Sequence, residues 1–245
     1  MDRSGAGHPG PRPVSWPPKT FLGMLDESTR EELLSLGISR EYLPDSVLML
    51  EGDHTTDVMA LIDGWVKVVG STEEGGQALL ALRVGGDLVG EQAALDSGPR
   101  SATVISAGVT AAQVISQRDF LRFLDRRPDA GVAVSRALSG ELRWATRRRI
   151  DFSGLPVLTR LARVLSELGR LYGKPTPNGV EFHYTLTQPE LAAMVGASEP
   201  SVHKALRQLR GEGIVVTGYR QVAITDPEAL DSIASSRRDA GNPIE

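Results

Sequence analysis

The sequence predicts an α+β fold in three successive parts: an N-terminal β-roll of jelly-roll type, one long helix, and a C-terminal winged helix-turn-helix. Short strand-like runs separated by glycine-containing turns fill residues 42–116. A helical pattern without proline then runs from Pro128 to Pro156, and a capped pair of helices follows at residues 187–206. A chain of 245 residues is long enough for two small domains.

The first part begins with residues 1–20, which are rich in Pro, Gly and Ser and predict a disordered leader. The roll domain is expected at residues 21–127, with a short helix near 27–36 before the strands. The clearest strand-like runs alternate or cluster apolar residues between turns, at residues 46–50, 58–62 and 64–69.

Residues 90–104 are the most distinctive segment of the predicted roll. Gly90 permits a positive φ, and a short helix from Glu91 can direct free backbone N–H groups toward an anion. Arg100 offers a planar, charged fork for phosphate oxygens, Ser101 adds a hydroxyl, and Glu91 can accept from a ribose hydroxyl. Singly, each residue has an ordinary surface role. Together they predict a phosphate and sugar pocket, with Gly90, Glu91, Gln92, Arg100, Ser101 and Ala102 as its binding residues.

The long helix is expected at residues 128–153, starting at Pro128. A stripe of mostly apolar residues recurs along it at steps of three and four residues and comprises Val134, Leu138, Leu142, Ala145, Arg149 and Phe152. A helix of this length could pack on its own domain, but the stripe favours a seam between two copies of the chain.

The winged helix-turn-helix is expected at residues 154–227. Thr187 and Glu190 form a capping box, Gly196 makes the bend, and Ser198 caps the second helix. Residues 213–224 then read as two strands of a wing, and residues 228–245 as a flexible tail.

Charge is distributed unevenly along the chain. Residues 1–142 carry 13 Lys or Arg and 20 Asp or Glu, whereas residues 143–220 carry 12 and 6. A basic C-terminal part suggests a polyanionic partner, although charges can also line a solvated face. The absence of Cys excludes disulfides, cysteine-ligated zinc and iron–sulfur clusters, and the four His residues show no metal-ligand spacing. No run is long enough to cross a membrane, so we expect a soluble, cytoplasmic protein.

These parts, in this order, resemble the CRP/FNR family of bacterial transcription regulators over residues 21–227. The resemblance implies a homodimer across the long helix, a roughly palindromic double-stranded DNA operator, and RNA polymerase as a further partner. It implies a cyclic nucleotide effector, cAMP or cGMP, with Glu91 on the ribose and Arg100 and Ser101 on the cyclic phosphate. It places the adenine-contacting pair of the family at Ala145 and Thr146, of which only Thr146 can form a hydrogen bond.

The chain departs from the family pattern on both of its functional sides. A family Arg that helps to hold the phosphate falls at Glu141, where a carboxylate would repel an anion. A guanine nucleotide, weak binding or a pocket retained only for structure are therefore open. At the recognition helix the family's Ser-Arg-Glu-Thr-Val is replaced by residues 198–202, Ser-Glu-Pro-Ser-Val, which predicts a different operator. The expected DNA-binding residues are Gln188, Ser198, Glu199, Ser201, His203, Lys204, Arg207 and Arg220.

Three functions compete for this architecture. The favoured one is a transcription regulator gated by a cyclic nucleotide, and the second is a constitutive regulator, or one gated by another ligand, with a vestigial pocket. An enzyme acting on a phosphorylated small molecule is the weakest, because the sequence has no Gly-rich P-loop with Lys and no recognisable nucleophile and base. We therefore expect no enzymatic activity.

Overall fold

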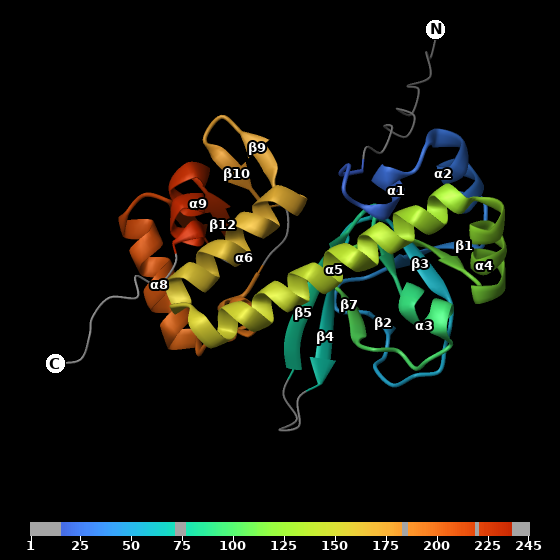
Figure 1. Cartoon of the computed structure of the whole chain (residues 1–245), viewed down its shortest axis with the longest axis horizontal. Coiled ribbons are helices and arrows are strands. Elements are labelled where there is room, and N and C mark those ends of the chain that lie inside the picture. Colours follow the sequence, from blue (N-terminus) through green and yellow to red (C-terminus); the bar gives the residue numbers. More distant parts are fainter. Residues whose placement is uncertain (1–15, 72–76, 183–185, 219–220, 237–245) are drawn as a thin grey trace, which may run out of the picture.

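The computed structural model describes residues 16–71, 77–182, 186–218 and 221–236. The predicted order of a β-rich domain, a long helix and a helix-turn-helix domain is confirmed (Figure 1). The roll and the C-terminal domain lie toward opposite ends of helix α5, which spans Pro128–Gly154. It is one residue longer at its C-terminal end than predicted.

Two four-stranded antiparallel sheets form the roll. One sheet has the order β1-β8-β3-β6, with strands Ile38–Tyr42, Thr110–Ile115, Val58–Asp63 and Leu88–Val89. The other has the order β2-β7-β4-β5, with strands Val47–Met49, Thr103–Ser106, Trp65–Ser71 and Gln77–Val84. Met49, Leu61, Val66 and Val104 are buried and pack in one cluster that joins the two sheets.

Four short helices accompany the sheets: α1 Phe21–Met24, α2 Glu27–Leu34, α3 Glu91–Asp96 and α4 Gln117–Arg126. Phe120 and Phe123 of α4 are fully buried and pack with Ala130 and Val134 of α5. This apolar contact fixes the first turns of α5 to the roll.

Part of the predicted leader is ordered. Trp16 donates its indole N–H to the Ile62 carbonyl at 2.9 Å, and the Thr20 side chain caps α1. The expectation of disorder is therefore wrong for residues 16–20, because the indole finds both an apolar surface and an acceptor. Residues 1–15 lie outside the described part of the chain.

The C-terminal domain contains helices α6 Val157–Tyr172, α7 Gln188–Val195, α8 Glu199–Gly211 and α9 Pro227–Ser235. Its sheet has the order β11-β12-β10-β9, with strands Val215–Gly218, Gln221–Ile224, Gly179–Glu181 and Lys174–Thr176. Helices α7 and α8 are the predicted pair, and β11 and β12 are the predicted wing. Strand β10 ends at Glu181, and residues 183–185 lie outside the described ranges.

The caps of the helix pair differ from one another. At α7 the predicted capping box forms: the Thr187 N–H donates to Glu190 at 2.8 Å, and the Glu190 N–H donates to the Thr187 hydroxyl at 3.3 Å. At α8, Ser198 is the N-cap residue as predicted, but its side chain makes no capping bond. Pro200 has no N–H to offer, and the Ser201 N–H donates to the Ser198 carbonyl instead.

Helix α9 corrects the prediction of a flexible tail for residues 228–235. Leu230 is fully buried, and the Arg163 guanidinium of α6 donates to the Ala234 carbonyl at 2.6 Å. Arg170 and Asp231 form an ion pair at 2.9 Å. The segment is therefore part of the domain, and residues 237–245 lie outside the described ranges.

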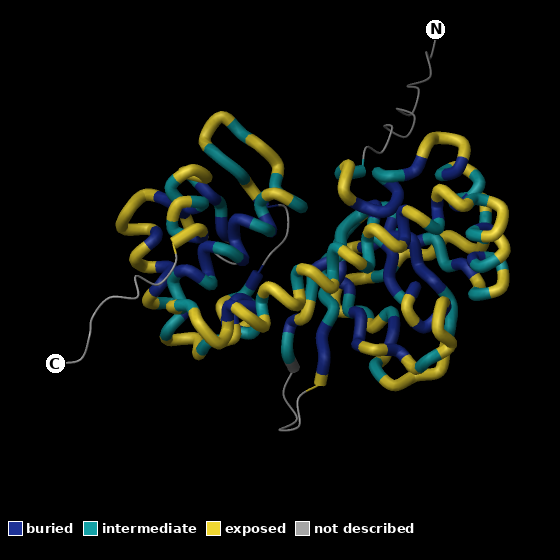
Figure 2. The backbone as a smooth tube through the Cα atoms, viewed as in Figure 1, coloured by how far each residue is buried: buried dark blue, intermediate teal, exposed yellow. Residues whose placement is uncertain are grey.

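The two domains contact each other beside α5. Leu79 and Leu82 of β5 are buried in the same cluster as Leu191 of α7. Lys67 of β4 and Glu190 of α7 form an ion pair across the contact. Figure 2 shows buried residues gathered in both domains, with much of α5 exposed between them. In this conformation, the ribbon of β4 and β5 is the docking platform for the C-terminal domain.

Arg148 of α5 bonds to both sides of the same contact, β5 and α7. Its guanidinium donates to the Leu80 carbonyl of β5 at 2.9 Å and to the Met194 carbonyl of α7 at 2.6 Å. It also stacks 4.4 Å from the Trp144 ring. Burial lowers the pKa of Arg148 to about 10.

Candidate functional site

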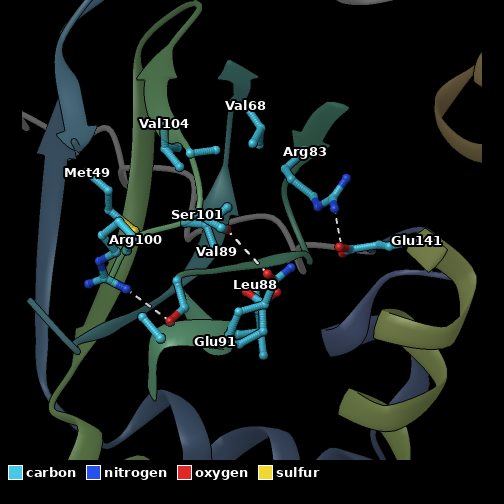
Figure 3. Close-up of a pocket in the computed structure, with 14 residues that line it drawn as sticks. Met49, Val68, Arg83, Leu88, Val89, Glu91, Arg100, Ser101, Val104 and Glu141 are labelled. Atoms are coloured by element: carbon cyan, nitrogen blue, oxygen red, sulfur yellow. Dashed lines mark hydrogen bonds and ion pairs between the residues drawn. The ribbon is translucent and has the colours of Figure 1, made fainter. Parts of the chain in front are cut away.

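A cavity of about 70 Å³ lies in the roll between β5, α3 and α5 (Figure 3). The structure brings six of the seven predicted ligand residues to its wall: Gly90, Glu91, Gln92, Arg100, Ser101 and Ala102. The other lining residues are Met49, Val68, Arg83, Leu88, Val89, Ala93, Val104 and Glu141. The wall thus combines an apolar floor with two guanidinium groups and two carboxyl groups.

Gly90 is required by the geometry of this wall. Its φ is 83°, in the left-handed region, and it precedes the first turn of α3. A Cβ at this position would lie 2.4 Å from the Arg100 Nη1 and 2.5 Å from the Met49 methyl group. Only glycine lets the α3 turn and the Arg100 side chain approach each other this closely.

Arg100 is 3 % exposed, and the roll itself satisfies its guanidinium. It donates to the Gly90 carbonyl at 3.0 Å, to the Asp57 carbonyl at 2.7 Å and to the Thr55 hydroxyl at 3.1 Å. The Asp57 carboxylate is also 3.1 Å away. Arg100 therefore links the start of α3 to the loop before β3. An incoming phosphate would have to compete with these acceptors for the guanidinium N–H groups.

Ser101 and Gln92 form the more open rim of the cavity. Both side chains are exposed, and the Ser101 hydroxyl donates to the Gln92 amide oxygen at 3.2 Å. These polar groups are bonded only to each other among the contacts that the described residues show, so a ligand can reach them without unfolding any element.

Glu141 also lines the cavity, as the sequence predicted, but it does not stand unopposed. The Arg83 guanidinium of β5 forms an ion pair with it across the wall (Figure 3). The expected repulsion toward an anion is therefore offset by a cation that sequence reasoning missed. The available signal was a single Arg in the apolar run of residues 78–84.

Two further carboxyl groups lie near Arg83. Burial raises the pKa of Glu91 to about 7, with a smaller contribution from Glu141, and burial raises the pKa of Asp87 to about 6. Burial lowers the pKa of Arg83, but Tyr172, Glu141, Asp87 and Glu91 together raise it above its ordinary value, so the guanidinium keeps its charge.

Glu91 predicts a measurable dependence of stability on pH. A carboxyl whose pKa is raised by folding stabilises the folded state below its ordinary pKa, and this stabilisation is lost as pH rises through about 7. Glu91→Gln is expected to remove about 2–3 kcal/mol of the fall in unfolding free energy between about pH 5 and about pH 8. Urea unfolding at both pH values measures this. Glu31→Gln, at an exposed carboxylate of α2, should behave as wild type; equal losses in all three proteins would contradict the assignment.

Thr146, the seventh predicted ligand residue, does not line the cavity. It lies on the exposed surface of α5, five residues beyond Glu141. About 500° of helical rotation separates this side chain from Glu141, so Thr146 is not part of the wall described here, and its contact with a ligand stays a prediction.

Seven of the eight predicted DNA-binding residues lie in the described part of the C-terminal domain. Of its residues, Gln188, Ser198, Glu199, Lys204 and Arg207 are exposed, and Ser201 and His203 are half-buried. Gln188, Glu199, Pro200 and His203 line one shallow depression, which brings the starts of α7 and α8 together. Arg220 lies outside the described residues.

Arg210 was not predicted but belongs beside this surface. It is exposed near the end of α8 and donates to the Thr217 hydroxyl of the wing at 3.1 Å. The available signal was the repeat of basic residues along the second helix, at positions 204, 207 and 210.

Among the described residues, none of the groups of His, Asp and Glu has the arrangement of a metal site. The described helices include none that is both long and apolar enough to span a membrane.

Comparisons with known proteins assign both halves of the chain. The cyclic nucleotide-binding domain family matches residues 39–127, and the Crp-like helix-turn-helix domain family matches residues 159–233. A CRP-like cAMP-activated global transcriptional regulator of Mycobacterium tuberculosis (strain CDC 1551 / Oshkosh) is 30% identical over 182 residues, 74% of this chain and 80% of that protein. The cyclic AMP receptor protein of Thermus thermophilus is 27% identical over 214 residues, 87% and 95% of the two chains.

Solved structures share the fold. FixK2 from Bradyrhizobium japonicum superimposes with a TM-score of 0.70 at 19% identity, covering 82% of this chain and 98% of its own. A transcriptional regulator of the CRP family from Thermus thermophilus gives 0.65 at 24% identity, covering 82% and 100%.

Proposed function

Because the chain belongs to the CRP/FNR family of DNA-binding transcription regulators, we propose that a cyclic nucleotide bound in the cavity of the roll sets its affinity for DNA. The family consists of regulators and not of enzymes. The proposed site of action is the bacterial cytoplasm, where the DNA is, and RNA polymerase is the expected partner at promoters.

The observation that carries the proposal is the convergence of six predicted ligand residues on one wall. Glu91 is the candidate acceptor for a ribose hydroxyl, and Ser101 with Arg100 is the candidate phosphate site. Arg83 supplies a second guanidinium, which pairs with Glu141. The cavity can therefore offset the charge of one phosphate although Glu141 lies in its wall. Either cAMP or cGMP fits this donor and acceptor set.

The cavity must expand to admit a nucleotide. Its volume of about 70 Å³ is well below the roughly 300 Å³ at which ligand pockets begin. Binding would therefore move α3, α5 or the β4–β5 ribbon, and the last two also contact the C-terminal domain. This linkage is the physical basis for a change in DNA affinity.

A homodimer through α5 is the proposed assembly. Leu142 is 69 % exposed and Ile150 is 61 % exposed, and both lie on the helix where it passes between the two domains. Large apolar side chains at this exposure are unfavourable in water, and pairing two copies of α5 would bury them. A dimer would also present two α8 helices to successive major grooves of a palindromic site.

A constitutive regulator is the second candidate. The small cavity and the internal hydrogen bonds of Arg100 would suit a pocket kept only for structure. In that case DNA affinity would not respond to any nucleotide.

The test combines two titrations of the full chain. Calorimetry with cAMP and with cGMP measures binding, and fluorescence anisotropy measures affinity for a duplex that the protein selects from a random pool. We expect one nucleotide to bind saturably and to change the DNA dissociation constant about fivefold or more. Ser101→Ala should weaken binding, and Ser135→Ala, at an exposed position of α5, should not. DNA binding without any response to either nucleotide would favour the constitutive regulator.

A further inference from the structure

The β4–β5 ribbon is a single wall shared by the cavity and the C-terminal domain. Neighbouring side chains of a strand point to opposite faces. Val66 of β4 pairs with Arg83 of β5, and the side chains of this pair lie on the face of the ribbon toward the cavity. The next pair, Lys67 and Leu82, lies on the opposite face, toward the C-terminal domain. A change at the cavity is therefore separated from α7 by the thickness of one sheet.

Arg83 is the residue of this wall that meets both domains. It is the last residue but one of β5, and its guanidinium forms the ion pair with Glu141 at the cavity. The guanidinium also donates to the Leu82 carbonyl at 3.0 Å. Tyr172 ends α6, and its hydroxyl donates to the same carbonyl at 3.1 Å. One buried cation thus lies between a carboxylate of the cavity and a phenol of the DNA-binding domain.

We propose that Arg83 transmits the state of the cavity to the DNA-binding domain, because its guanidinium pairs with Glu141 and also meets the Tyr172 hydroxyl at the Leu82 carbonyl. The inference rests on the proposed function, since it names how that site is coupled to DNA. A ligand phosphate would draw Arg83 away from Glu141, and a ligand donor on Glu141 would release Arg83. Either event would move the Arg83 guanidinium relative to the Leu82 carbonyl and the Tyr172 hydroxyl, and would change the hydrogen bond between β5 and α6.

A double-mutant cycle between the two ends of this path tests the proposal without any ligand. Glu141→Gln keeps the shape of the side chain and removes its charge, and Tyr172→Phe removes only the hydroxyl. The DNA dissociation constant is measured by anisotropy for both single variants and for the double variant. Tyr42→Phe is the matched control, because Tyr42 is also part-buried but donates to Met59 within the roll.

We expect Glu141→Gln to change the DNA dissociation constant by about fivefold or more in the wild-type and Tyr42→Phe backgrounds. In the Tyr172→Phe background the same substitution should change it by less than about twofold. Glu141→Ala provides a second removal of the carboxylate, and circular dichroism melting establishes that each variant is folded.

Two results would overturn the proposal: no effect of Glu141→Gln or Glu141→Ala on DNA affinity, or equal effects in all three backgrounds. Neither result depends on nucleotide binding. The nucleotide titration of the wild type is a separate arm, and a missing response there would count against the proposed function while the cycle still decides the role of Arg83.

Discussion

Replacing Arg100 by Ala is expected to lower the free energy of unfolding by about 3 kcal/mol and to abolish nucleotide binding. The guanidinium is 3 % exposed and joins Gly90, Thr55 and Asp57 through four hydrogen bonds. Its removal takes a charged donor from the Gly90 and Asp57 carbonyls and from the Thr55 hydroxyl, and opens space beneath Gly90. Urea unfolding followed by circular dichroism measures the first effect, and calorimetry the second.

Two further variants test whether the loss of stability comes from the hydrogen bonds of Arg100. Arg100→Lys retains the charge but not the planar fork, so we expect a loss of stability smaller than that of the Ala variant. Arg118→Ala, at a side chain 74 % exposed, should change the unfolding free energy by less than about 0.5 kcal/mol. If Arg100→Ala unfolded with nearly the wild-type free energy, the hydrogen-bond network described for the cavity would not hold the roll together.

Leu142→Asp is expected to convert the proposed dimer into monomers and to weaken DNA binding. The substitution would place two carboxylates in an apolar seam, and we expect the dissociation constant of the dimer to rise at least about 100-fold. Analytical ultracentrifugation measures the oligomeric state, and anisotropy measures the accompanying loss of DNA affinity.

The matched variant for this experiment is Arg118→Asp. Arg118 is also exposed, but it lies on α4 and not on α5. We expect it to leave the dimer intact, because it adds a carboxylate outside the proposed seam. Equal dissociation constants for the dimers of the Leu142→Asp variant and the wild type would remove α5 from the proposed interface.

The sequence predicted those features whose cause is local. The capping box of Thr187 and Glu190, the bend at Gly196 and the left-handed turn at Gly90 each depend on residues within a few positions. The order of the two domains followed from where these local signals lie along the chain. The cluster of six ligand residues was also predictable, since all of them fall within residues 90–102.

The failures concern contacts between distant segments. Arg83 and Glu141 are 58 positions apart, and their pairing depends on how α5 crosses the roll. Helix α9 is stable because α6 covers Leu230, which its own composition does not reveal. Thr146 was placed by the family resemblance alone and stays a prediction, because the direction of its side chain depends on the rotation of α5 about its axis.

Arg148 places a desolvated charge at the contact between the two domains. Its Nε is buried and finds no hydrogen-bond partner in the described part of the chain, and only carbonyl groups receive its other protons. A desolvated cation without a carboxylate beside it is costly, so part of the gain from apolar burial at α7 is cancelled. When the domains separate, water would hydrate this charge. We therefore expect this desolvated charge to weaken the docked arrangement, and a ligand that favours separation of the domains has correspondingly less binding energy to supply.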